Sequence, residues 1–150
     1  MSMPMSLERR GGKLPLRRRP LAMAAVATAR LLATQPPGRI RSVLTRLRRG
    51  AAPADYRQAL AARDAVTAVS MACRGAQGCV PRSVATALVC RASGVWPTWC
   101  VGVRKVGPFA AHAWVEADGV KVGEREPVDY FQPLIAIPPE GVTVSGTTVS

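Results

Sequence analysis

Aromatic and acidic residues are both scarce in this sequence of 150 residues. Phe, Trp and Tyr make up 5% of it, and residues 1–50 contain none of them. Because proteins that bind single-stranded nucleic acids stack the bases on aromatic rings, the first third of the chain offers no platform for such a ligand. No stretch approaches the ~18 consecutive apolar residues of a membrane-spanning helix. We therefore expect no nucleic-acid partner and no membrane span.

The charge is mostly of one sign and lies at one end. The net charge is +12, and residues 1–50 contain twelve Arg and Lys but a single acidic residue. Such a basic segment suits nucleic acid, an anionic membrane or an acidic peptide partner, or it is only a solvated surface. Arg17–Arg19 before the apolar run 21–29 resembles a signal peptide superficially, but Arg30 interrupts that run. We favour a cytoplasmic protein, with the signal peptide as the alternative.

The four cysteines show no metal-binding pattern. Cys73, Cys79, Cys90 and Cys100 include no C-x-x-C pair, and the single histidine is His112. Structural zinc sites need more closely spaced ligands, and a chain of this length and apolar content does not need disulfides to fold. We expect no metal and no cofactor, and we interpret all the cysteines except Cys79 as packing residues.

The apolar period divides the chain into helices followed by strands. Helices are predicted over 20–34, over a short segment that Gly50 ends, from the N-cap Asp55 to about Ala72, and from Cys79 to Ser93. From Thr98 the period changes to two, and strands are predicted over about 98–103, 110–116, 120–124 and 130–137. Helices followed by an antiparallel sheet indicate the α+β class.

Cys79 begins a helix directly after a Gly-Ala-Gln-Gly loop. The free backbone N–H groups and the positive end of the helix dipole favour a thiolate there. The thiolate is the nucleophilic form of cysteine. Cys79 is therefore the candidate nucleophile, while the common alternative is a small buried cysteine.

His112 lies in the middle of a predicted strand, where a histidine is by default a packing or surface residue. A three-residue hairpin loop at Ala117–Gly119 would pair Glu116 with Val120 and place Glu124 opposite His112. A two-residue turn would instead place Arg125 there. The glycine at the third loop position favours the first register, which makes His112 a candidate base oriented by Glu124.

These residues lie in motifs that carry a family resemblance. The stretches Gly78-Cys-Val-Pro-Arg-Ser83, Trp99-Cys-Val-Gly-Val103, Ala111-His-Ala-Trp-Val-Glu116 and Val122-Gly-Glu124 resemble the transglutaminase-like proteases of lasso-peptide biosynthesis. Those enzymes are the standalone protease form of the B protein, which removes the leader from the precursor. The resemblance covers about residues 20–137.

The resemblance implies a papain-like or transglutaminase-like cysteine protease core with an N-terminal helical extension. It implies Cys79 as nucleophile, His112 as base and Glu124 as the third member, where many relatives have Asp. It also implies three partners: the precursor peptide, a small leader-recognition protein and an ATP-dependent lasso cyclase. The backbone N–H of Cys79 and one further donor would bind the oxyanion. Gln77 is a candidate for that donor, although a glutamine in a loop more commonly faces solvent. Arg82 and Ser83 are expected to hold local structure.

We accordingly divide the chain into four parts. They are a basic flexible leader (1–19), a helical partner-docking extension (20–54), a transglutaminase-like catalytic domain (55–137) and a flexible tail (138–150). Two other functions stay open at this point. One is an acyltransferase on the same scaffold, and the other is a basic binding module without catalysis.

Overall fold

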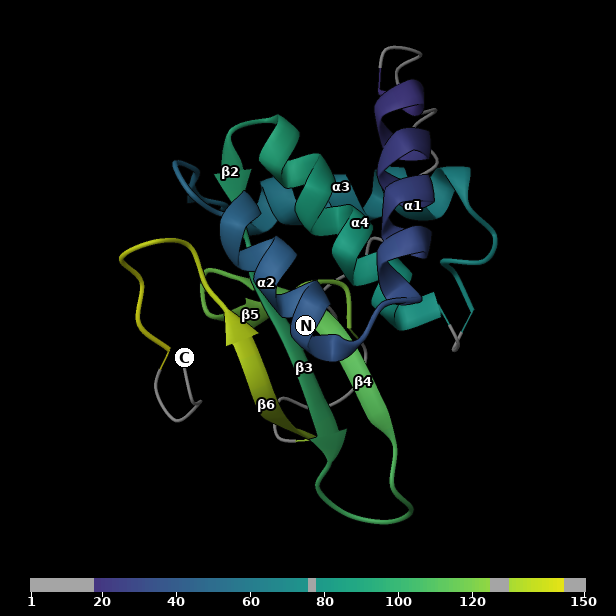
Figure 1. Cartoon of the computed structure of the whole chain (residues 1–150), viewed down its shortest axis with the longest axis vertical. Helices are drawn as coiled ribbons and strands as arrows, with labels where there is room; N and C mark the ends of the chain where they lie inside the picture. Colours follow the sequence, from purple (N-terminus) through teal and green to yellow (C-terminus); the bar gives the residue numbers. More distant parts are fainter. Residues whose placement is uncertain (1–17, 76–77, 125–129, 145–150) are drawn as a thin grey trace, which may run out of the picture.

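The structure is a computed structural model, and it describes residues 18–75, 78–124 and 130–144. The helices are α1 (Arg19–Ala33), α2 (Pro37–Leu47), α3 (Tyr56–Val69) and α4 (Cys79–Ala92). The strands are β1 (Ala52–Pro53), β2 (Val95–Trp96), β3 (Thr98–Arg104), β4 (Ala111–Ala117), β5 (Val120–Lys121) and β6 (Phe131–Ile137). The order of helices before a small antiparallel sheet confirms the α+β class (Figure 1).

Local sequence signals set where the helices start. Pro20 and Pro37 lie in the first turns of α1 and α2, where their missing N–H costs no hydrogen bond. Asp55 caps α3 in a full capping box, accepting from the Gln58 N–H while the Gln58 side chain accepts from the Asp55 N–H. The helix ends at Val69 rather than at Ala72, because the extended backbone of Ser70 starts a turn.

Helix α4 is the centre of the molecule. Eight of its 14 residues are buried, and it packs against α1, α3 and β4. Five of the eight are apolar, and the buried polar residues Arg82, Ser83 and Thr86 are hydrogen-bonded within the chain. The four-stranded sheet has the order β5-β4-β3-β6, and its long strands run from beneath the helices to the opposite end of the molecule (Figure 1).

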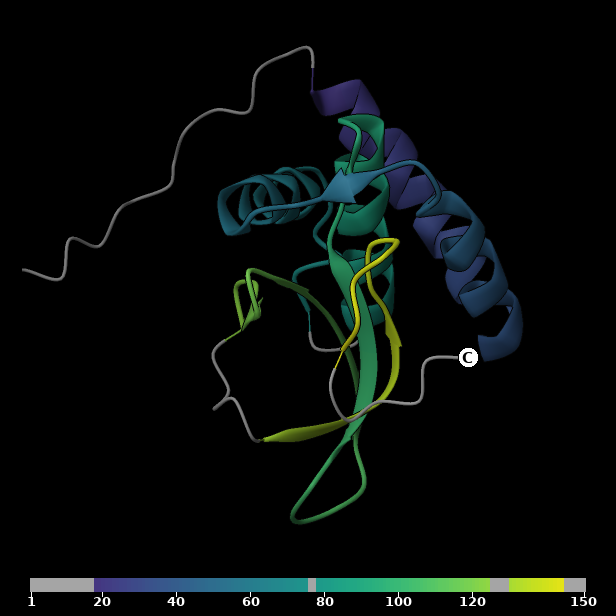
Figure 2. The ribbon, with the colours of Figure 1, turned by 90° about the vertical axis from the view of Figure 1, so that its left-hand side faces the viewer.

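Helix α1 belongs to the same core as α4. Its buried residues are Ala22, Ala25, Val26 and Ala29, and three of these are members of the main core cluster. Small side chains at this spacing let α1 approach α4 closely. Figure 2 shows α1 and α2 together on one side of the molecule. The segment 20–54, expected as an extension, is thus packed into the folded unit, and its role in partner docking stays a prediction.

The β4–β5 hairpin has a different register from the one that we predicted. Glu116 pairs with Lys121 and Ala117 with Val120, so the loop has two residues instead of three. Both loop residues, Asp118 and Gly119, have positive φ (53° and 74°), as a type I′ turn requires. Aspartate tolerates this conformation better than most residues, and the Asp118 carboxylate accepts a long-range hydrogen bond from the Tyr56 N–H at the start of α3, at 2.9 Å.

Two further features lie at the ends of the segments that we predicted. Residues 51–54, at the end of the expected helical extension, contain β1, which pairs in parallel with β2 through Ala52 and Val95. The expected flexible tail begins with a fully buried Pro138, whose carbonyl accepts from Arg48 Nη1 at 2.9 Å. Residues 138–144 therefore start as part of the folded unit. Among the described residues, no helix has the length and apolar content to cross a membrane.

Candidate active site

The start of α4 brings the Cys79 thiol close to the sheet. Gly78 precedes it, and a β-carbon at Gly78 would overlap the carbonyl oxygen of Ala72 and lie 3.0 Å from the Cα of Cys73. Only glycine allows the chain to pass the preceding turn so closely before the helix begins. The side chain of Cys79 is half-buried, hydrogen-bonded to His112, and contacts the backbone N–H of Ala113.

Aromatic packing holds the ring of His112 in the sheet. His112 stacks on Phe131 with ring centroids 4.8 Å apart, and Trp114 lies 5.9 Å away on the same face of β4. Gly102 is opposite His112 in the β3–β4 register. A β-carbon there would lie 2.8 Å from the Trp114 ring and overlap the Gln132 carbonyl, so glycine keeps the aromatic layer intact.

Glu124 reaches His112 because the returning strand turns after it has paired with β4. The Val122 N–H still donates to the Val115 carbonyl, which continues the two-residue register. In that register a straight strand would place Arg125, not Glu124, opposite His112. Gly123 has φ +68° and changes the chain direction, and Glu124 Oε2 lies 3.1 Å from His112 Nε2. The predicted contact between these two side chains is thus present, although the register predicted for it was wrong.

The three side chains form one chain of hydrogen bonds. Glu124 engages Nε2 of His112, and the Cys79 thiol is hydrogen-bonded to the same ring. The hydrogen bond from His112 lowers the pKa of Cys79, and the Ala113 N–H and Arg82 lower it further against the effect of burial. The bonds to Cys79 and Glu124 raise the pKa of His112 to about 9. Both shifts favour the thiolate of Cys79 and the imidazolium of His112.

Glu124 is kept ionised despite its burial. Its side chain is 8% exposed, and burial alone would raise its pKa. The hydrogen bond to His112 and the positive charges of Arg82 and Arg63 outweigh burial and lower the pKa. The carboxylate therefore stays charged and stabilises the imidazolium of His112.

Sequence reasoning missed the part that Arg82 and Arg63 have in this site. Arg82, 9% exposed, donates from Nη1 to the Cys73 carbonyl at 3.1 Å, and its Nη2 lies 3.9 Å from Glu124 Oε1. It follows Cys79 by three residues, which puts both on one face of α4. That spacing was the only sequence signal that Arg82 belongs to the site. No sequence signal pointed to Arg63 on α3.

The other predicted positions have simpler roles. Ser83 accepts a hydrogen bond from Trp99 Nε1 at 3.0 Å in the core, which is a structural contact. The cysteines other than Cys79 are all buried and unbridged: Cys73, Cys90 and Cys100. Within the described ranges no cluster of His, Cys, Asp and Glu could hold a metal ion. Gln77 and Arg125 lie outside the described residues.

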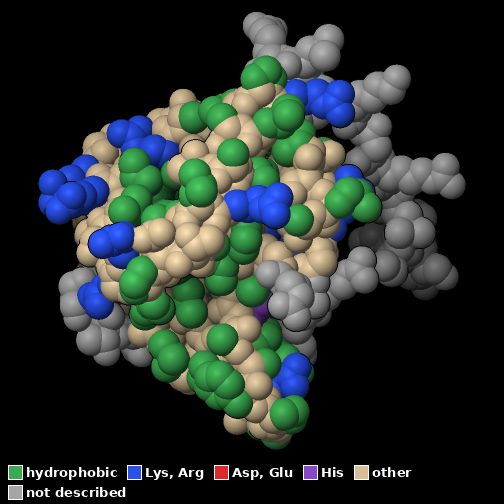
Figure 3. Space-filling model, turned by 45° about the vertical axis from the view of Figure 1, so that its right-hand side comes forward, with side chains coloured by type: hydrophobic (Ala, Val, Ile, Leu, Met, Phe, Trp, Pro, Cys, Tyr) green, Lys and Arg blue, Asp and Glu red, His purple; other side chains and the backbone are tan. Residues whose placement is uncertain are grey.

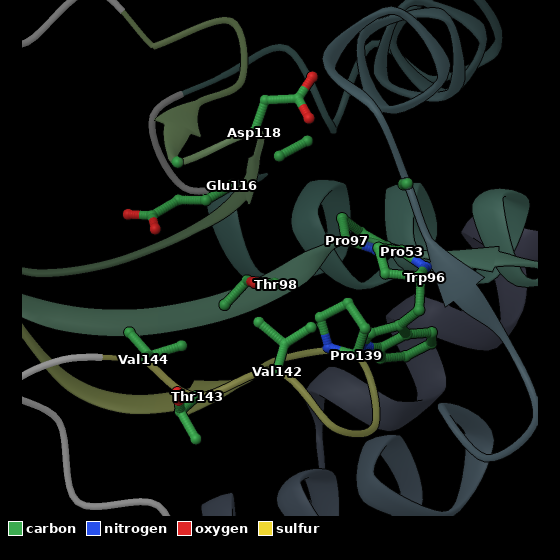
Figure 4. A pocket seen from close by; sticks show the side chains of 13 residues that line it. Pro53, Trp96, Pro97, Thr98, Glu116, Asp118, Pro139, Val142, Thr143 and Val144 are labelled. Atoms are coloured by element: carbon green, nitrogen blue, oxygen red, sulfur yellow. The ribbon is translucent and has the colours of Figure 1, made fainter.

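A pocket of about 380 Å³ lies at the other end of β3 and β4 (Figure 4). Trp96 and three prolines form its apolar wall. The carboxylate of Glu116 accepts from Trp114 Nε1, and that of Asp118 accepts from the Tyr56 N–H. None of Cys79, His112 and Glu124 lines it, so this pocket is separate from the candidate catalytic site.

Comparison with known proteins is consistent with this geometry. The model of one family, described as the transglutaminase-like superfamily, matches residues 22–136. No curated protein and no solved structure matches the chain significantly. The matched range includes α1 from Ala22 onward as well as every residue of the candidate site.

Proposed function

Since the chain belongs to the transglutaminase-like superfamily, which includes cysteine proteases and acyltransferases, we propose that it is a cysteine peptidase. Cys79 is the nucleophile, His112 the general base and acid, and Glu124 the residue that orients His112. The observation that carries this proposal is the His112 ring, which is hydrogen-bonded to the Cys79 thiol on one side and to the Glu124 carboxylate on the other.

The proposed reaction is amide hydrolysis in two steps. The Cys79 thiolate attacks the carbonyl carbon, and the tetrahedral oxyanion is stabilised by the Cys79 backbone N–H at the start of α4. The C–N bond then breaks as the imidazolium of His112 gives its proton to the departing amine. Water attacks the resulting thioester, His112 takes its proton, and the thiolate is released. Glu124 stabilises the positive charge of His112 throughout.

The proposed substrate is the precursor of a lasso peptide, cut between leader and core. This proposal is supported by the four sequence motifs that resemble lasso-peptide leader peptidases, because the fold brings three of them together around one site. Gly78–Ser83 supplies the nucleophile, Ala111–Glu116 supplies the base, and Val122–Glu124 supplies the orienting acid.

We further propose that the enzyme works with a small leader-recognition protein and that its product passes to an ATP-dependent lasso cyclase. Both partners follow from the resemblance in sequence. Free thiols are typical of the reducing cytoplasm, and the four cysteines of this chain are unbridged. We therefore place the reaction in the cytoplasm.

The direct test uses the protein with its precursor peptide and recognition protein, followed by mass spectrometry. The expected products are the core peptide and a leader that ends in a free carboxyl group. Cys79→Ala should abolish cleavage, and Cys90→Ala should retain it, because Cys90 is buried on the same helix and lies away from His112. A leader that carries an amine adduct would identify an acyltransferase, and cleavage by Cys79→Ala would refute the thiol mechanism.

A further inference from the structure

An apolar groove of about 260 Å³ lies between α1 and α2. Its walls come from the second half of α1 and from α2, and α4 contributes one residue between them. The lining aliphatic side chains are Leu31, Leu32, Val43, Leu47 and Leu88. Leu31 is 72% exposed, which is unusual for a leucine beside other leucines on a folded protein.

The polar residues of the groove are already hydrogen-bonded within the chain. The Thr28 hydroxyl donates to the Ala24 carbonyl at 2.9 Å, and the Gln35 amide oxygen accepts from Arg39 Nη1 at 2.7 Å. Neither polar side chain therefore needs a ligand to satisfy its hydrogen bonds. The groove offers aliphatic contact area, which fits apolar side chains of a helix or a strand.

The charge around the groove has one sign. Residues 18–54 contain eight arginines and no Asp or Glu. Arg30, Arg39 and Arg46 lie on α1 and α2 with exposed side chains. On the face that Figure 3 shows, with the α1 side turned forward, Lys and Arg side chains lie among apolar ones and no acidic side chain is visible. We call the arginines of α1 and α2 beside the groove the arginine rim. A ligand with acidic side chains beside its apolar ones would match the charge of this rim.

The groove faces away from the nucleophile. Leu88 follows Cys79 by nine residues on α4, which at 100° per residue is a rotation of about half a turn and a distance of roughly 14 Å along the axis. The two side chains therefore lie on opposite faces of the helix. A molecule bound in the groove leaves the Cys79 thiol accessible to a substrate.

Neither the N-terminal segment of this chain nor a second copy of the chain has the charge that would suit the groove. Residues 1–17 contain four basic residues and one acidic one, so they would be repelled by the arginine rim. A second copy would present its own α1 and α2, which are equally basic. Nucleic acid has the right charge, but its phosphates do not fill an aliphatic groove.

We propose that this groove docks an acidic amphipathic helix of a protein partner. Apolar side chains of that helix fill the space around Leu31 and Leu88, and its Asp and Glu residues pair with the arginines of α1 and α2. The proposal deepens the proposed function and rests on it in one respect, which is that the partner is the leader-recognition protein. The binding surface itself is independent of the Cys79 chemistry.

The test measures binding without catalysis. The probe is a fluorescent 16-residue helical peptide with Leu at i, i+3, i+4 and i+7 and Glu at most other positions. Fluorescence anisotropy should show saturable binding to the full chain that weakens as salt is added. Leu31→Glu should weaken binding by about tenfold or more, because it puts a carboxylate where an apolar anchor sits. Met23→Glu is the control, since Met23 is also on α1 and 61% exposed but does not line the groove.

Several results would overturn the proposal. They are no saturable binding, equal binding of the peptide with Lys in place of Glu, and equal loss in Leu31→Glu and Met23→Glu. Self-association that Leu31→Glu abolishes would identify a second copy as the occupant instead. Competition by duplex DNA or by phosphatidylserine vesicles that depends on Leu31 would identify those ligands. Cleavage is measured separately, so a failure of peptide binding is distinct from a failure of the proposed activity.

Discussion

Cys79 and Cys90 carry the same thiol on the same helix, yet their surroundings act on it in opposite directions. Burial raises the pKa of Cys90 to about 12. The hydrogen bond from His112 lowers the pKa of Cys79, and the positive charge of Arg82 adds to this effect. The difference depends on the contacts that the fold brings to the first turn of α4.

Alkylation should therefore separate the two cysteines. Iodoacetamide should modify Cys79 at pH values below the ordinary thiol pKa of about 8.5, because the thiolate is the reacting form. In His112→Ala the midpoint of this pH profile should move up toward that value. Peptide mass spectrometry reads both sites in one digest, and Cys90 in the folded protein is the internal control. An identical profile in wild type and His112→Ala would contradict the ion pair.

Activity should depend on pH through His112 as well. Its raised pKa, about 9, means that the imidazolium persists below that value and is lost as the pH rises through it. Since only the protonated ring can donate to the departing amine, kcat/KM should fall on the alkaline side near pH 9. The acid limb should follow the protonation of the Cys79 thiolate. A rate still rising above pH 10 would exclude His112 as the acid.

Glu124→Gln tests the third member of the site. The neutral amide keeps a hydrogen-bond acceptor but removes the charge that stabilises the imidazolium, so kcat/KM should fall by about 10²-fold. The alkaline limb of the pH profile should also move to lower pH. Glu116→Gln is the matched control, because its carboxylate accepts from Trp114 Nε1 away from His112, and it should change kcat/KM less than about twofold. Equal losses in the two variants would remove Glu124 from the mechanism.

The hairpin shows what sequence can and cannot predict about this site. The pairing of His112 with Glu124 was expected from a three-residue loop, and the turn has two residues. A type I′ turn was possible from Asp118-Gly119, but the sequence alone did not choose between the registers. The contact exists because Gly123 turns the chain, and Gly123 adopts its conformation against the Arg63 side chain on α3. That long-range contact is invisible in the local sequence.

Alanine substitutions at two glycines should distinguish the effect of backbone strain on stability from the effect of a displaced Glu124 on activity. Gly119 and Gly123 both have positive φ, so alanine costs about 1 kcal/mol of conformational energy at each. A β-carbon at Gly119 has no atom within 4 Å, whereas at Gly123 it would lie 2.8 Å from Arg63 Nη1. Gly123→Ala should therefore lower kcat/KM by about tenfold or more by displacing Glu124, while Gly119→Ala lowers only the melting temperature, by a few degrees. Equal activity in both variants would show that Glu124 tolerates movement of this turn.

For the whole molecule, local signals predicted the order of elements and the place of Cys79 at a helix start, but not how distant segments meet. The helix starts follow from Asp55, from the prolines and from the glycine before Cys79, because these signals lie within a few residues of each start. The parallel pairing of Ala52 with Val95 and the two arginines beside Glu124 depend on the tertiary arrangement. The basic segment 20–54 is the clearest case, since its charge suggested a separate docking extension and its buried alanines place it in the core.

Truncation distinguishes these two roles of α1. Deletion of residues 1–34 removes Ala22, Ala25, Val26 and Ala29 from their contacts, a loss of about 5 kcal/mol at roughly 0.8 kcal/mol per buried carbon. Because domains of this size are stable by only about 5–15 kcal/mol, the truncated chain should melt more than about 15 °C lower or fail to fold. Deletion of residues 1–17 removes none of the described core and should change the melting temperature by less than about 2 °C. If α1 were only a docking segment, the protein lacking residues 1–34 would keep the melting temperature of the full chain and the low-pH alkylation of Cys79. It would lose only partner-dependent cleavage.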